Sequence, residues 1–151
     1  MGVVCVCESR GWLVYSTGYV NPDLVFFDLA ADAELFRMPC EFGCFFVNVN
    51  IIVPITTCAS GPVEGVSGFQ SIAVSASGEY LAAVTDVPDF RLTVFHVPSR
   101  AVLARVHHEL HRVSAVTFNP ANEHEIVVFV PGKAHLFTLE QCRTLAALVS
   151  R

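Results

Sequence analysis

Three segments of the chain share one outline, in which apolar positions alternate and the run closes on an aromatic residue followed by a polar one. They are Leu24–Leu29, Leu92–Val97 and Ala134–Leu139. The two later aromatic residues, Phe95 and Phe137, lie 137 − 95 = 42 positions apart. Alternation of this kind is typical of β-strands, and self-similarity at roughly 40–45 residues is typical of repeated four-stranded units. The pattern therefore predicts a β-repeat protein.

Short apolar runs separated by turn residues divide the chain into three units of four strands. The strands expected in the first unit are Val3–Glu8, Trp12–Gly18, Asp23–Leu29 and Glu34–Met38. Those of the second are Ser71–Ser75, Tyr80–Thr85, Arg91–Val97 and Ala101–Val106. Those of the third are Val113–Phe118, Glu125–Val130, Lys133–Leu139 and Thr144–Val149. No segment has the periodicity of a helix, so we expect none.

Many short strands with self-similar spacing favour an all-β fold, and a β-propeller over a sandwich. We expect residues 1–151 to form a partial propeller of about three four-stranded antiparallel blades. The blade units are about 1–38, 69–107 and 112–150. Closed propellers have roughly 4–8 blades, so three units should leave a face of each outer sheet exposed. Such a chain should self-associate or need the rest of a longer parent protein.

The repeat also predicts which residues form the core. Phe27, Phe95 and Phe137 should occupy equivalent positions on the third strands of successive sheets. Val116 and Phe118 should be buried beside the second sheet.

The spacing fails once, between the first and second units. Phe27 and Phe95 lie 95 − 27 = 68 positions apart, an excess of 68 − 42 = 26 over the later spacing. The surplus falls at about 39–68, which is apolar as far as Ile55, whereas a connection between blades is normally short and polar. Two explanations stay open: a real insertion that packs against a partner, or coding foreign to the mature protein, such as a retained intron.

Composition narrows the class of protein. The chain is 53% hydrophobic and only 15% charged, which excludes disorder and leaves ample material for a core. Its net charge is −5 and its nine Lys and Arg residues are scattered, so we expect no nucleic-acid partner. The amino terminus has no basic region before its apolar stretch, and the longest apolar run, at 42–55, contains Asn48, Asn50 and Pro54. We therefore expect neither a secretory signal nor a membrane partner.

Six cysteines invite a disulfide or zinc interpretation, which their spacing does not support. Cys5 and Cys7 lie on one face of a predicted strand, Cys40 and Cys44 have three residues between them, and no C-x-x-C pair recurs. We expect free thiols in a reducing compartment, no metal and no cofactor.

Catalytic candidates are few. The segment 105–111 contains His107, His108, Glu109 and His111, but it lacks the His-Glu-x-x-His spacing of a helical zinc site. Residues 75–78 form a predicted turn rather than the strand-to-helix elbow of a serine nucleophile, and no phosphate loop occurs. These absences predict a protein that is not an enzyme and has no catalytic residues.

Carboxylates such as Asp86 and Asp89 have the ordinary role of turn residues. Asp28 follows the aromatic residue of its strand, where it can accept hydrogen bonds from a neighbouring turn. The equivalent residues of the later units are His96 and Thr138.

The segment Ser75–Ala82 resembles the Ser-x-x-Gly-x-Tyr-Leu-Ala turn of WD-repeat blades. Pro88–Phe95 resembles a segment of the cilia- and flagella-associated WD-repeat proteins that form the inner dynein arm tether and tether head. Val116–Pro120 and Gly18–Leu29 are similar to the following and preceding blades of that family. The resemblance covers most of the chain outside 39–68, and it implies a WD40-like propeller fragment.

The resemblance also implies a function. Such a fragment would belong to a non-catalytic axonemal scaffold that ties an inner dynein arm to the doublet microtubule and supports ciliary motility. Its partners would be dynein-arm and tether subunits and the rest of the parent propeller. The family usually has Trp-Asn-Trp where this chain has Phe95-His96-Val97, and its members are far longer. No residue-level binding site transfers, because the family's contacts are spread over blade edges and loops.

Two alternatives remain. A generic cytosolic WD-repeat adaptor in signalling or ribosome biogenesis would contain the same blades. A metal-dependent hydrolase using His107, His108 and His111 is the other alternative, and it lacks the motif geometry.

Overall fold

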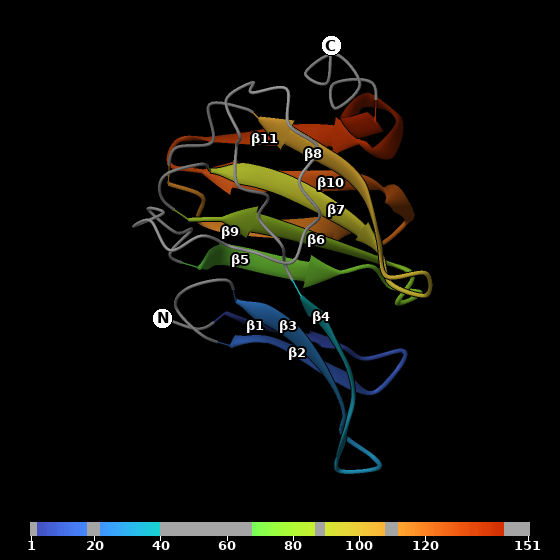
Figure 1. Ribbon diagram of the computed structural model, residues 1–151. Helices are drawn as coiled ribbons and strands as arrows, with labels where there is room; N and C mark the ends of the chain where they lie inside the picture. The colour runs from blue at the N-terminus through green and yellow to red at the C-terminus, as the bar shows by residue number, and fades with distance from the viewer. Residues whose placement is uncertain (1–2, 18–21, 40–67, 87–89, 108–111, 144–151) are drawn as a thin grey trace, which may run out of the picture.

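The computed structural model describes residues 3–17, 22–39, 68–86, 90–107 and 112–143, which form three antiparallel sheets (Figure 1). The first sheet has the order β1-β2-β3-β4, from Val4–Cys7, Trp12–Thr17, Asp23–Asp28 and Ala33–Pro39. The second has the order β5-β6-β7-β8, from Phe69–Val74, Tyr80–Thr85, Arg91–His96 and Ala101–His107. The third has the order β11-β10-β9, from Ala115–Asn119 (β9), Asn122–Val130 (β10) and Lys133–Thr138 (β11). The all-β prediction is confirmed.

Strand ends differ from the predicted ones by three residues or fewer. The largest difference is at β10, which begins at Asn122 rather than Glu125 because Asn122 pairs with Asn119 across a tight turn and an irregularity in the ladder. The strand predicted at Thr144–Val149 lies outside the described residues. So does nearly all of the predicted insert at about 39–68, of which only Pro39 and Gly68 are described.

The expectation that the chain has no helix is wrong, since residues 139–143 form a helical turn, which also takes Leu139 from the predicted end of β11. The Thr138 hydroxyl accepts a hydrogen bond from the Gln141 amide at 3.2 Å, and the Gln141 side-chain oxygen accepts one from the Thr138 amide at 3.0 Å. This reciprocal pair is a capping box, which satisfies the backbone donors at the start of a helix. The helix therefore begins directly where the strand ends.

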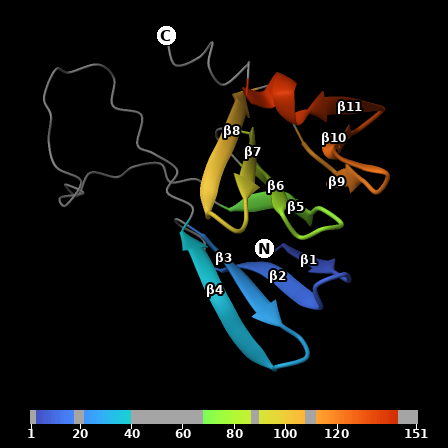
Figure 2. The same ribbon diagram turned by 90° about the vertical axis from the view of Figure 1, so that its right-hand side faces the viewer.

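The three sheets stack side by side, with the second sheet in the middle. Their first strands, β1, β5 and β9, lie next to one another, and β4, β8 and β11 point outward from them (Figure 2). The sheets are thus arranged as a fan about the line of first strands.

Two apolar clusters fill the spaces between the sheets. The cluster between the first and second sheets contains Val14, Leu24, Phe26, Met38, Phe69, Ile72, Leu81, Ala83, Phe95 and Val97. The cluster between the second and third contains Ala73, Ala82, Val84, Leu92, Val94, Ala104, Val106, Val113, Val116, Phe118, Ile126, Val128, Phe137, Leu139 and Cys142. The second sheet contributes to both clusters, and residues 81–85 of β6 and 91–95 of β7 are all buried. Successive apolar side chains of these strands point alternately into the two clusters, and the buried polar residues among them are Thr85, Arg91 and Thr93.

The predicted equivalence of the third-strand aromatics is confirmed. Phe27, Phe95 and Phe137 are each the fifth residue of a six-residue strand, β3, β7 and β11 respectively. Phe95 and Phe137 are buried, each against the preceding sheet. Phe27 is partly exposed, because no sheet of the described residues covers its face. Val116 and Phe118 are buried in the cluster shared with the second sheet, as expected.

Truncation of Phe95 tests this packing. Its side chain is 4% exposed, so Phe95→Ala should leave a cavity and lower the free energy of unfolding by roughly 3–5 kcal/mol in urea denaturation. Val102→Ala, at a residue 42% exposed on β8, is the matched control and should cost less than about 1 kcal/mol. Similar losses for the two variants would contradict the assignment of Phe95 to the core.

Candidate functional site

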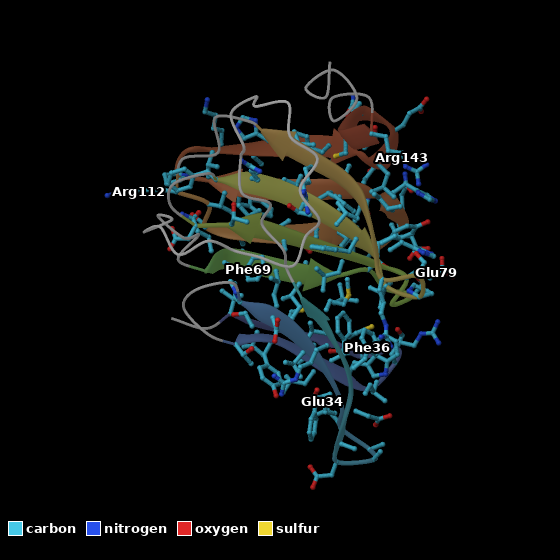
Figure 3. The ribbon with its side chains drawn as sticks, viewed as in Figure 1. Glu34, Phe36, Phe69, Glu79, Arg112 and Arg143 are labelled. Atoms are coloured by element: carbon cyan, nitrogen blue, oxygen red, sulfur yellow. The ribbon has the colours of Figure 1, made fainter. Side chains whose placement is uncertain are left out.

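The turns that follow the first strand of each sheet lie at one end of the stack, which we name the turn end. It comprises residues 8–11 after β1, 75–79 after β5 and 120–121 after β9. In Figure 3 this end lies on the right, where Glu79 is labelled, and Arg112 marks the opposite end. Most connections at the opposite end lie outside the described residues.

The middle turn is closed by its own serines. The Ser75 amide donates to the Tyr80 carbonyl at 2.8 Å, and the Ser75 hydroxyl accepts from the Tyr80 amide at 3.1 Å. The Ser77 hydroxyl accepts from the Glu79 amide at 3.1 Å. Gly78 has a φ of 77°, a left-handed conformation that favours glycine, and its amide donates to the Ser75 carbonyl at 3.0 Å.

The first sheet binds the middle turn through two side chains of its own turn. The Arg10 Nε donates to the Ser77 carbonyl at 2.8 Å, and the Ser9 hydroxyl donates to the Ala76 carbonyl. The Arg10 guanidinium also lies over the Trp12 ring, 5.6 Å from its centroid, in cation–π geometry. These contacts satisfy two backbone acceptors of the middle turn.

The third sheet binds the same turn from the other side. The Glu123 carboxylate accepts a hydrogen bond from the Ser77 amide at 3.3 Å. Hydrogen bonds from Ser77, first from its hydroxyl and then from its amide, lower the pKa of Glu123, and the Ser75 hydroxyl and the charge of His124 add to this effect. The middle turn is therefore held from both flanks, and the relative position of all three sheets is fixed at this end.

Aromatic and cationic side chains complete the turn end. The Tyr80 ring lies between two imidazoles, with centroid distances of 5.9 Å to His96 and 5.6 Å to His124. Farther out, the Arg100 guanidinium lies 4.6 Å from the centroid of the Phe36 ring, so a turn of the second sheet covers an edge strand of the first. Side chains of this kind, with an apolar body and a polar tip, are the ones that protein interfaces favour.

The last residue of each third strand forms a hydrogen bond to the turn that follows it. Asp28 accepts hydrogen bonds from the amides of Ala30 and Ala31 at 2.8 and 3.0 Å, which confirms the role expected for it. At the equivalent positions, His96 Nδ1 lies 2.7 Å from the Ser99 hydroxyl, and Thr138 forms the capping box. The later sheets have therefore kept the function of Asp28 with different side chains.

The described cysteines are free thiols, as expected. They are Cys5, Cys7 and Cys142. Burial is the main cause that raises the pKa of Cys5 to about 12, with Cys7 adding to it, and burial raises the pKa of Cys142 to about 11. Both thiols therefore stay protonated at neutral pH and act as small apolar groups.

Among the described residues, no group of three or more His, Cys, Asp or Glu side chains could hold a metal ion. The residues of the hydrolase alternative, His108 and His111, lie outside the described residues, as does the side chain of His107. No helix in the described part of the chain is long and apolar enough to cross a membrane.

Substitution of Gly78 tests the contact between the first and second sheets. A Cβ at residue 78 would lie 2.7 Å from Arg10 Cγ, so Gly78→Ala adds a displacement of Arg10 to the strain of a positive φ. Gly132→Ala is the matched control, because Gly132 has a φ of 84° and open space around it. Each substitution should lower the free energy of unfolding by at least about 0.5–1 kcal/mol, and Gly78→Ala by clearly more than the control. Equal losses would contradict the proposed contact.

Alkaline titration tests the buried thiols. Because folding raises the pKa of Cys5 above its ordinary value of 9.0, the stability from its neutral form is fully present below pH 9.0. It is lost as the pH rises from 9.0 toward about 12, at up to about 1.4 kcal/mol per pH unit. In chemical denaturation, Cys5→Ala should lose stability less steeply than the unmodified chain over this range. Superimposable pH profiles would contradict the assignment.

No protein-family model matches the sequence, and no curated protein matches it. Among solved structures, the chain is similar to the crystal structure of the β-propeller domain of Cps50 (Swd1) from Myceliophteria thermophila. The alignment has a TM-score of 0.60 and 13% sequence identity, and it covers 91% of this chain and 35% of that chain. At this identity the likeness shows the fold alone. The fan of three sheets is therefore a β-propeller fragment, and each sheet is a blade.

Proposed function

We propose that the chain is a non-catalytic WD-repeat scaffold that binds other proteins through its turn end. The observation that carries the proposal is the middle turn, to which the first and third blades are both hydrogen-bonded through Arg10 and Glu123. A surface held in this way is pre-organised, so binding a partner costs less conformational entropy. The fold supports the proposal, because propellers are platforms on which loops carry the binding residues.

The finer proposal is that the scaffold is axonemal. Its support is the resemblance of Pro88–Phe95 and Val116–Pro120 to the inner dynein arm tether family. In this proposal the chain binds dynein-arm and tether subunits in the cilium or flagellum and supports motility. A cytosolic adaptor for signalling or ribosome biogenesis is the second candidate, and it rests on the blades alone.

Proximity labelling in ciliated cells tests both levels of the proposal. The tagged chain should reach the axoneme and label dynein-arm proteins. Glu79 has an exposed side chain at the turn end, and its replacement in Glu79→Lys should weaken labelling about tenfold, equivalent to ~1.4 kcal/mol of binding. Lys133→Glu, an exposed charge reversal at the opposite end, is the control and should leave labelling unchanged.

The possible outcomes separate the two levels. Absence from axonemes contradicts the axonemal proposal and leaves the adaptor as the better candidate. Equal labelling by Glu79→Lys and the unmodified chain contradicts the role of the turn end, wherever the chain localises.

A further inference from the structure

The first blade exposes apolar positions that the other two blades bury. Leu13 pairs with Phe27, Leu81 with Phe95 and Ile126 with Phe137, so these pairs set a common register for the three blades. The first-strand residues that pair with Leu13, Leu81 and Ile126 are therefore equivalent, and they are Val6, Val74 and Phe118. The residues two positions earlier, Val4, Ile72 and Val116, are equivalent as well.

Exposure differs sharply among these equivalent residues. Ile72 and Val116 are 6% and 5% exposed, because the preceding blade covers each of them. Val4 and Val6 are 62% and 54% exposed. We name the surface formed by Val4, Val6, Leu13, Tyr15, Val25 and Phe27 the rear face of the first blade. Val25 is fully buried in it and Leu13, Tyr15 and Phe27 are partly buried, so Val4 and Val6 are its exposed part.

The third blade exposes apolar residues on the opposite side of the stack, at positions that the first and second blades bury. Leu136 directly precedes the third-strand aromatic residue of its blade, as Phe26 and Val94 do in theirs. Phe26 and Val94 are fully buried, whereas Leu136 is 60% exposed. Phe129 is equivalent to Val84 by the same register, and it is 43% exposed where Val84 is fully buried. We name the surface formed by Val127, Phe129, Ala134 and Leu136 the forward face of the third blade.

The chain itself shows what covers such faces. The forward face of the first blade covers the rear face of the second, and the forward face of the second covers the rear face of the third. A free rear face and a free forward face are therefore the two halves of the same interface. They lie on opposite sides of the stack with the second blade between them, so one copy cannot join them (Figure 2).

We propose that two copies of the chain pair head to tail, with each forward face of a third blade on the rear face of the other copy's first blade. Two copies of three blades make a six-bladed ring, within the range of roughly 4–8 blades that propellers adopt. A twofold axis relates the copies and repeats the same interface twice, so the ring closes and leaves neither the rear face nor the forward face free to extend it.

Analytical ultracentrifugation of the full chain is the direct test. The expected mass is that of a dimer, twice the 16.4 kDa of one chain, over a wide range of concentrations. A monomer overturns the proposal, as does a ladder of larger species, which would indicate open polymerisation. This measurement needs no variant, so the proposal stays falsifiable even where a substitution prevents folding.

Two single variants identify the pairing. Val6→Asp damages only the rear face and Leu136→Asp only the forward face, so each should be monomeric alone, with the circular dichroism of the unmodified chain. Mixed together, they should form a heterodimer, since the intact forward face of the Val6→Asp chain meets the intact rear face of the Leu136→Asp chain. Val102→Asp, at an exposed residue of the edge strand β8, is the control and should remain a dimer.

The variants also separate the competing arrangements. If two rear faces paired with each other, Leu136→Asp would still dimerise alone, and if two forward faces did so, Val6→Asp would. Either result, or a mixture that stays monomeric, overturns head-to-tail pairing.

Discussion

The structure depends on one constraint: a sheet that is buried on both faces must be covered on both. The strands β6 and β7 have no solvent-facing side, since residues 81–85 and 91–95 are all buried, the polar Thr85, Arg91 and Thr93 included. Burial of apolar area is the main favourable term in folding, and each half of this sheet's apolar area is removed from water by a different neighbour. The second blade is therefore stable only as the middle layer, and the same arrangement makes the outer blades dependent on further neighbours.

Apolar packing is not directional, so it brings the blades together without fixing their relative position. The polar contacts of the turn end fix the relative position of the blades. Arg10 and Glu123 approach residues 75–79 from opposite blades, and each bonds to backbone groups of a turn closed by its own serines. A hydrogen bond requires a narrow range of distance and angle, so these contacts define how far each blade can slide. The surface proposed for binding is thus also a place where polar contacts join all three blades.

The sequence was sufficient to predict the repeat, because strand alternation and the spacing of Phe95 and Phe137 are local signals with a direct physical cause. It was also sufficient for the role of Asp28, whose partners follow within three residues. The sequence could not predict the hydrogen bonds between blades at the turn end. Arg10 and its acceptor are 67 residues apart, and no local pattern indicates a contact between blades. The helical turn does have a local signal, because residues 138–141 read Thr-x-x-Gln, the pattern of a capping box, although the strand alternation runs up to the same residues.

The distribution of reactive groups bears on what kind of function the described part of the chain can perform. The hydroxyls of Ser75 and Ser77 are engaged in closing a turn, and the thiols of Cys5 and Cys142 are held neutral by burial. A nucleophile needs the opposite treatment, a lowered pKa or an adjacent base. The groups that face solvent at the turn end include charged and aromatic side chains, which are common at protein interfaces. These hydroxyls and thiols therefore take part in the fold, and the binding role proposed for the turn end rests on its exposed charged and aromatic side chains.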